Sequence, residues 1–415
     1  MITELSVKNY KSILDHTIQL GRFNVFIGEN GCGKTNLLEA LAMASASLGD
    51  KLEAEELYSK GIRIAKPSIT FSSFLATKQA QEITLKCAFT ATQDADPETV
   101  LFTICSQESR GIDTKWIDKA SIQRSVVLPS TMNVDEPGAA FVRLLNEYAS
   151  ADSIERAEPI VSQGQLDFTR VMEVIKRNGA VLRRRTKLAS QLGEFVIYNL
   201  SLLALRGIQP SSRKTPLGIY GENLDVLIST FNKGEAKELL DRAKVITWLD
   251  KVLVDAEDVL KFKGYKLGRS TSTLYFRDRF MRRGNNIFSA ENANEGILHI
   301  LFYLALFISK KTPAIFGIDN IETALNPQLC RDLTKELAAL AKKNGKQALV
   351  TTHNPAILDG LDLHDDDQRL FVVYRNDHGH TVTKRIKLKP EAGGEKHKLS
   401  ELWMRGHLGG LPRRF

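Results

Sequence analysis

A glycine-rich segment near the start of the chain constrains the fold more than any other feature. The buried-strand pattern of residues 23–27 leads into Gly-Glu-Asn-Gly-Cys-Gly-Lys-Thr at residues 28–35, and a helical run follows at residues 36–42. This is the G-x-x-x-x-G-K-[ST] pattern, placed between a strand and a helix as its mechanism requires. The glycines let backbone N–H groups surround an anion, and the helix N-terminus adds a fixed positive dipole. The sequence therefore predicts an α/β protein with a nucleotide phosphate site.

The pattern assigns roles to individual loop residues. We expect Lys34 to reach the β- and γ-phosphates of ATP, and the Thr35 hydroxyl to ligate Mg²⁺. Cys32 lies beside Lys34 and near a helix N-terminus, surroundings that lower a thiol pKa. We nevertheless favour a packing role for Cys32, as a small side chain in a permissive loop position. The residues expected to bind the nucleotide are Gly28, Asn30, Gly31, Cys32, Gly33, Lys34, Thr35 and Asn36.

Composition sets the broad class of the protein. The chain has 415 residues, of which 43% are hydrophobic and 26% charged, as is typical of a globular protein. A net charge of +8 permits a polyanionic partner without requiring one. The four cysteines form no C-x-x-C pair, which fits a reducing compartment. No signal peptide is recognisable, and the longest apolar run, residues 297–308, is too short to span a bilayer. We therefore predict a soluble cytoplasmic protein that does not bind membranes.

Further strands place acidic and imidazole groups at the expected sheet edge. Residues 314–319 read as an apolar strand that ends in Asp319, the expected second Mg²⁺ contact. Residues 348–353 read as another buried strand that ends in His353, and a predicted helix at 327–343 connects the two. The polar segment 289–296 leads directly into the apolar helix 297–308, which is a second anion-binding geometry. A partial guanine-specificity motif at residues 232–235 has the wrong last residue, so we reject a GTPase.

This order of elements resembles a known family. Strand and P-loop, insertion, polar helix start, Asp-terminated strand and Thr-Thr-His strand are similar to the ABC-type ATPase heads of the SMC/RecF/OLD (overcoming-lysogenization-defect) group. Residues 5–13 resemble that group's first strand, and residues 216–224 resemble a turn before its second helical stretch. The resemblance is good at both ends of the chain and poor over roughly 60–210. Within the group, the chain looks most similar to short AAA-type ATPases of bacterial phage-defence operons, which act with a separately encoded effector.

The resemblance implies a dimer and several site residues. Asn294, Glu295 and Gly296 would form the signature segment, which contacts the γ-phosphate held by a second copy in a head-to-tail dimer. His353 would be the switch histidine that senses this phosphate. The segment 325–327 would cross the dimer interface. The family also has a glutamine that contacts Mg²⁺, for which Gln79 and Gln81 are the candidates.

The chain departs from the family at one catalytic position. The family usually has a glutamate directly after the Walker B aspartate, but here that residue is Asn320. An amide cannot accept a proton from the attacking water, and general-base catalysis typically contributes about 10²–10⁴-fold. Glu322 could substitute, although it also matches a second acidic position common in these heads. We therefore predict a weak or partner-dependent ATPase whose catalytic set is Lys34, Asp319, Asn320, Glu322 and His353, with Thr35 and Asp319 as metal ligands.

We divide the chain into three parts. Residues 1–110 and 256–415 form the two parts of a P-loop ABC-type ATPase head, a mixed sheet flanked by helices. Residues 111–255 form a mostly helical insertion, with helical periodicity at 194–205 and 224–231. Within the first part, residues 68–71 and 83–89 are predicted as antiparallel strands.

Two basic stretches of the sequence are compatible with more than one kind of binding partner. One lies at residues 176–187, and the other, at 261–283, has eight Lys or Arg residues interleaved with aromatics. This composition is typical of a nucleic-acid surface, but strand alternation or an acidic protein partner explains it equally well. The main hypothesis is an ATP-dependent dimer or larger homo-oligomer that acts as sensor or scaffold for an effector nuclease or toxin in anti-phage defence. The alternative is a RecF-like ATPase that binds double-stranded DNA in repair or recombination.

Overall fold

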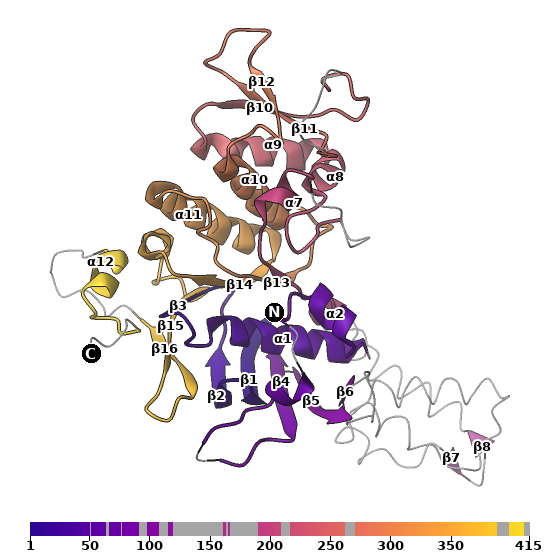
Figure 1. Ribbon diagram of the computed structural model, residues 1–415, viewed down its shortest axis with the longest axis vertical. Helices are drawn as coiled ribbons and strands as arrows, with labels where there is room; N and C mark the ends of the chain where they lie inside the picture. Colours follow the sequence, from indigo (N-terminus) through magenta and orange to yellow (C-terminus); the bar gives the residue numbers. More distant parts are fainter. Residues whose placement is uncertain are drawn as a thin grey trace.

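The protein is represented by a computed structural model, drawn as a ribbon in Figure 1. Much of the predicted insertion lies outside the described residues, as does the basic stretch at 176–187. The structure describes residues 1–49, 51–63, 66–75, 77–90, 98–107, 115–118, 161–162, 165–166, 190–208, 216–261, 270–387 and 398–410.

A six-stranded sheet forms the centre of the fold. Its strand order is β16-β15-β3-β14-β13-β9, and all neighbouring strands are parallel except β15 and β16. The sequence prediction of buried strands before the P-loop, before Asp319 and before His353 is confirmed, and the three strands are adjacent. Their carboxyl ends therefore share one edge, where α/β proteins bind ligands. The strands are β3 (Phe23–Ile27), β9 (Ile197–Tyr198), β13 (Ile315–Ile318), β14 (Gln347–Thr352), β15 (Gln368–Arg375) and β16 (Thr381–Ile386).

Successive residues of β3 face two different cores. Val25 packs with the helices α10 and α11, whereas Phe26 packs with α1 and a second sheet on the opposite face. Burial on both faces explains why the strand is an unbroken apolar run. The helix α10 is buried around its whole circumference from Ile297 onward, which explains the long apolar run there. These helices are α1 (Lys34–Leu48), α10 (Glu295–Ile308) and α11 (Pro327–Asn344).

The second sheet is antiparallel and lies on the α1 side, in the lower part of Figure 1. Its strand order is β2-β1-β4-β5-β6, so the strand predicted at 83–89 is confirmed. The strand predicted at 68–71 is wrong: a 3₁₀ turn, η1 (Pro67–Ile69), occupies this segment, and only Phe71 makes a bridge, to Tyr10. The Pro67 ring, which has no N–H group to donate, favours the turn. The strands are β1 (Ile2–Tyr10), β2 (Ile13–Gln19), β4 (Glu82–Phe89), β5 (Glu98–Gln107) and β6 (Lys115–Asp118), with α2 (Ala54–Ser59) nearby in the sequence.

The helix predicted at residues 194–205 is wrong. Residues 197–198 form β9, the edge strand of the central sheet, and only residues 202–205 are helical, as α7 (Leu202–Leu205). Phe195 through Tyr198 are all buried, because this segment lies between the sheet edge and both cores. Tertiary pairing with β13 therefore overrides the helical periodicity.

A small three-stranded sheet lies at the upper end of Figure 1, close in the sequence to α10. The helix predicted at 224–231 is confirmed as α8 (Leu224–Ser229), and α9 (Lys233–Arg242) follows it with an Asn232–Glu235 capping box. The sheet contains β10 (Leu249–Val254), β11 (Leu274–Asp278) and β12 (Ile287–Ser289). The remaining elements are η2 (Ala243–Val245), η3 (Pro355–Gly360), α12 (Leu399–Met404) and the short pair β7 (Val161–Ser162) and β8 (Gln165–Leu166).

The fold is thus a mixed α/β head of the predicted class. None of the helices in the described part of the chain combines the length and apolar character needed to cross a bilayer.

Candidate functional site

The P-loop connects β3 to α1 and leaves the start of that helix without a side-chain cap. Gly33 is the N-cap residue, with φ of +105°, and no side chain accepts a hydrogen bond from the first turn. Gly31 also has a left-handed φ, of +75°, so two glycines give the loop a backbone that other residues rarely adopt. A helix N-terminus with uncapped N–H groups binds an anion well.

Lys34 lies folded back onto its own loop. Its ammonium group donates hydrogen bonds of 2.9 Å to the carbonyl oxygens of Gly28 and Glu29, and the side chain is buried. Burial lowers the pKa of Lys34, while the nearby Asp319 and Glu322 carboxylates oppose this shift. The two carboxylates therefore lie within electrostatic range of the lysine, as the sequence predicted for a shared site.

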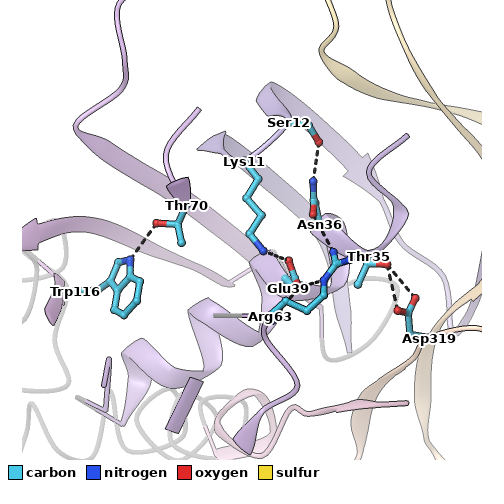
Figure 2. A network of polar contacts seen from close by, with 9 residues as sticks. All are labelled: Lys11, Ser12, Thr35, Asn36, Glu39, Arg63, Thr70, Trp116 and Asp319. Carbon is cyan, nitrogen blue, oxygen red and sulfur yellow. Dashed lines mark hydrogen bonds and ion pairs between the residues drawn. The ribbon is translucent and has the colours of Figure 1, made fainter. Parts of the chain in front are cut away.

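Thr35 and Asp319 meet across the sheet edge. The Thr35 hydroxyl donates to both carboxylate oxygens of Asp319, at 3.1 and 3.2 Å, although the two residues are 284 positions apart (Figure 2). The Thr351 hydroxyl also donates to Asp319 and fixes the orientation of that carboxylate. A hydroxyl and a carboxylate that converge beside a phosphate site are the oxygen donors that Mg²⁺ prefers. The donor set therefore fits the predicted metal.

The segment after Asp319 connects β13 to the end of β14, where His353 lies. Asn320 has a left-handed φ of +56°, and its backbone N–H donates to the Thr351 hydroxyl at 3.0 Å. Glu322 accepts a hydrogen bond of 2.8 Å from the backbone N–H of His353 through Oε1. Its second oxygen, Oε2, is buried and has no hydrogen-bond partner among the described residues.

His353 lies beside the P-loop. Its imidazole interacts with the backbone of Gly28, and both partial burial and the positive charge of Lys34 lower the pKa of His353. The neutral ring is thus favoured near neutral pH. The structure therefore brings Gly28, Lys34, Thr35, Asp319, Glu322 and His353 together at one sheet edge.

The predicted signature segment occupies a separate part of the chain's surface. The Asn294 side chain caps α10 by accepting from the Ile297 N–H at 3.0 Å, and Glu295 begins the helix. A Cβ atom on Gly296 would lie 3.4 Å from the carbonyl oxygen of Ala324. The same Cβ atom would lie 3.9 Å from Leu325 Cδ2, so the predicted signature segment lies close to the start of the predicted interface segment 325–327.

Cys32 and Gln79 have surroundings that differ from those expected from the sequence. Cys32 is buried, and burial raises the pKa of its thiol more than the neighbouring Lys34 lowers it. The expectation that the loop lowers this pKa is therefore wrong, and the favoured packing role fits. Gln79, a candidate for the Mg²⁺-contacting glutamine, instead donates to the Ser68 carbonyl at 2.8 Å.

Sequence reasoning missed a polar network behind the P-loop helix (Figure 2). Glu39, fully buried on α1, forms ion pairs with Lys11 from the β1–β2 turn and with Arg63. Asn36 donates to the Ser12 hydroxyl at 2.7 Å and accepts from Arg63 at 3.4 Å. The only local signal for this network was an acidic residue, Glu39, within an otherwise apolar helical run.

Two family models match the chain. One, described as "AAA ATPase domain", matches residues 1–167, which contain the P-loop. The other, described as "AAA domain, putative AbiEii toxin, Type IV TA system", matches residues 227–359, which contain the signature segment, Asp319 and His353. No curated protein matches the sequence.

Solved structures of SMC heads are similar over nearly the whole chain. The SMC head domain from Thermotoga maritima is 11% identical, with 94% of this chain and 99% of that chain covered and a TM-score of 0.42. The Smc head with an extended coiled coil bound to the C-terminal domain of ScpA, derived from Pyrococcus furiosus, is 15% identical, with coverage of 93% and 96% and a TM-score of 0.48. The Smc head with a coiled coil and joint from Pyrococcus yayanosii is 11% identical, with coverage of 98% and 99% and a TM-score of 0.46.

The fold, the P-loop site and the two AAA family models together define a P-loop ATPase. The order of its motifs, from P-loop through predicted signature segment to Asp319 and His353, is the one expected of ABC-type ATPase heads of the SMC/RecF group, and each AAA family model matches less than half of the chain.

Proposed function

We propose that the protein binds Mg²⁺-ATP, dimerises around it and hydrolyses it slowly, so that nucleotide mainly controls assembly with a separately encoded effector. The observation that carries this proposal is Asn320, which stands where a catalytic glutamate is expected. Its backbone N–H donates to the Thr351 hydroxyl, which holds the main chain at this position next to Asp319. An amide cannot act as a general base, and the associated rate factor is typically about 10²–10⁴.

The residues at the sheet edge would have different roles in nucleotide binding. Lys34 would exchange its loop carbonyl partners for phosphate oxygens, because an ammonium group is better satisfied by an anion than by neutral carbonyls. Thr35 and Asp319 would hold Mg²⁺, which neutralises phosphate charge when bound. His353, largely neutral at pH 7, would report on the γ-phosphate through its contact with the P-loop at Gly28.

Slow hydrolysis would depend on Glu322. One of its oxygens holds the His353 backbone, and the other is buried without a partner among the described residues. A carboxylate can accept a proton from water, whereas the Asn320 amide cannot. We therefore assign residual general-base activity to Glu322.

Dimerisation would use the surface formed by the signature segment and residues 325–327. Gly296 lies close to Ala324 and Leu325, so the two segments are neighbours, as a head-to-tail arrangement needs. In that arrangement, Asn294, Glu295 and Gly296 of one copy would face the P-loop of the other. Two nucleotides would then lie between two heads.

The defence role is proposed from the second family model, whose description links its AAA domain to a type IV toxin–antitoxin system. A slow ATPase suits such a role, because a long-lived ATP state can hold an effector until a trigger arrives. We propose a bacterial anti-phage defence role, with the effector a nuclease or toxin encoded separately.

One experiment tests this function. ATP turnover and molecular mass by light scattering are measured for the wild type and Lys34→Ala, with and without double-stranded DNA. We expect little turnover and an ATP-dependent increase in mass that is lost in Lys34→Ala. Fast turnover without DNA, or no effect of ATP on mass, would refute the proposal.

A DNA-binding ATPase of repair or recombination is the second candidate. It is favoured by the β11–β12 hairpin tip, where Phe280 is 75% and Met281 45% exposed beside the exposed Arg282 and Arg283. Arginines with an exposed aromatic suit nucleic acid. DNA-stimulated turnover that is lost in the double variant Arg282→Ala/Arg283→Ala would support this candidate over the first.

A further inference from the structure

A threonine from the far end of the chain supports the P-loop from behind. The Thr381 hydroxyl, at the start of β16, donates a hydrogen bond of 2.7 Å to the carbonyl oxygen of Cys32, 349 positions away. Thr381 and Cys32 are each 1% exposed, so water cannot replace this hydrogen bond. A Cβ atom on Gly33 would lie only 2.2 Å from the Thr381 oxygen, which shows how closely the threonine packs against the loop.

This hydrogen bond is the last in a series of hydrogen bonds. The donor and the acceptor in each of them follow from the chemistry of the groups. A carbonyl can only accept, so the single Thr381 hydroxyl proton points to Cys32. The Ser12 hydroxyl, 2.7 Å from Thr381, must then donate to it. Ser12 in turn accepts from the Asn36 amide at 2.7 Å, which leaves the Asn36 oxygen for Arg63. In each hydrogen bond of this series, the donated proton therefore points toward the P-loop backbone.

The geometry of the peptide bond gives this anchor a consequence for anion binding. The Cys32 carbonyl and the Gly33 N–H belong to one peptide unit, and none of the described peptide bonds is cis. In a planar trans peptide, C=O and N–H point in opposite directions. Holding the carbonyl on Thr381 therefore aims the Gly33 N–H away from Thr381. Without the anchor, glycine at position 33 leaves this peptide free to rotate.

We propose that Thr381 is a positioning residue for nucleotide phosphate, which acts by fixing the orientation of the Cys32–Gly33 peptide, with Ser12 and Asn36 orienting its hydroxyl. This inference rests on the proposed binding of ATP. A rotated peptide would present carbonyl oxygen instead of N–H to the phosphates, and the affinity for an anion would fall.

The test compares two substitutions that separate the hydroxyl group of Thr381 from the shape of its side chain. Thr381→Val keeps the shape of the side chain and removes the hydroxyl, whereas Thr381→Ser keeps the hydroxyl. ATP affinity is measured by isothermal titration calorimetry in the presence of Mg²⁺, and the midpoint of urea unfolding is measured on the same samples. We expect Thr381→Val to bind ATP about tenfold more weakly, and Thr381→Ser to bind within about twofold of the wild type.

A second variant tests whether Ser12 donates to Thr381. It also replaces Thr381→Val in the test if the valine variant does not fold. Ser12→Ala leaves the Thr381 hydroxyl in place but removes the donor that orients it, so we expect about a threefold loss of ATP affinity. In a double variant with Thr381→Val, the Ser12→Ala change should have almost no further effect, because the hydroxyl that it orients is already gone.

Different results would refute the proposed function and the positioning role of Thr381. Wild-type protein that does not bind ATP would refute the function itself. Wild-type binding with equal affinity in Thr381→Val, or in Ser12→Ala if the valine variant does not fold, would overturn the positioning role alone. A loss of affinity in the valine variant that Thr381→Ser does not rescue would also overturn it.

Discussion

The Oε1 atom of Glu322 accepts a hydrogen bond of 2.8 Å from the backbone N–H of His353, which connects the segment after Asp319 to the predicted switch histidine. The other carboxylate oxygen is buried and has no partner among the described residues. Glu322 thus joins the two segments through one oxygen, and its carboxylate is the acidic group that follows Asn320 in the sequence. In a chain with asparagine at position 320, this is the arrangement on which slow hydrolysis would depend.

The first prediction concerns this carboxylate. Glu322→Gln keeps an oxygen that can accept from His353 but removes the proton acceptor, so we expect residual ATP turnover to fall about 100-fold. ATP affinity should change little. Turnover is measured as phosphate release with excess ATP, and unchanged turnover would show that Glu322 is not the base.

The second prediction restores the missing glutamate. Asn320→Glu should raise turnover by about 10²-fold, because it supplies a general base where the family has one. Asn320→Gln has nearly the same size without the carboxylate and should not raise turnover. Both variants should lose about 1 kcal/mol of stability, because residue 320 has a left-handed φ of +56° that asparagine tolerates best. An equal rate for the two variants would contradict the assignment.

The third prediction concerns the buried network of Glu39. Glu39→Gln should lower the free energy of unfolding by about 3 kcal/mol, because it leaves Lys11 and Arg63 without their shared carboxylate. Asp15→Asn is the control, since Asp15 pairs with Lys8 on the surface and should contribute less than about 1 kcal/mol. Urea unfolding of both variants provides the measurement, and similar losses would argue against a structural role for the network.

The fourth prediction concerns pH. Lys346 is buried, donates to the carbonyls of Thr312 and Pro313, and has its pKa lowered by burial to about 8. Between pH 8 and 10.5 the unfolded lysine binds a proton that the folded one has lost. The contribution of Lys346 to stability should therefore rise as pH increases through this window.

Lys346→Met isolates this effect. The difference in unfolding free energy between the wild type and Lys346→Met should increase in favour of the wild type from pH 8 to pH 10. Contributions from other titrating groups, such as the buried Cys330, cancel in this difference. A difference that stays constant across the window would show that the folded lysine remains charged.

The sequence predicted those parts of the fold and site that local patterns encode. Gly28 to Thr35 follow a buried strand and precede a helix, so their place at the sheet edge could be predicted. Asp319 and His353 each end an apolar strand, and parallel strands align their carboxyl ends. The contact between Thr35 and Asp319, the proposed Mg²⁺ donors, is therefore a direct consequence of strand order.

The features that were missed depend on contacts between distant segments. Thr381 carries no local signal, because its role arises only when β16 packs beside the β1–β2 turn. The helical periodicity of residues 194–205 was misleading, because pairing with β13 at the sheet edge makes residues 197–198 a strand. The residue pattern of this short segment does not by itself reveal such pairing.

The central claim is that ATP joins two heads, and light scattering tests it most directly. The wild type, Lys34→Ala and Gly296→Asp are measured with and without Mg²⁺-ATP, and nucleotide binding is verified separately by calorimetry. Gly296→Asp places a carboxylate where the partner's phosphate would lie, so it should bind ATP but stay unassembled. The account predicts that ATP at least doubles the mass of the wild type and leaves both variants unchanged. A wild type that binds ATP without any change in mass would contradict it.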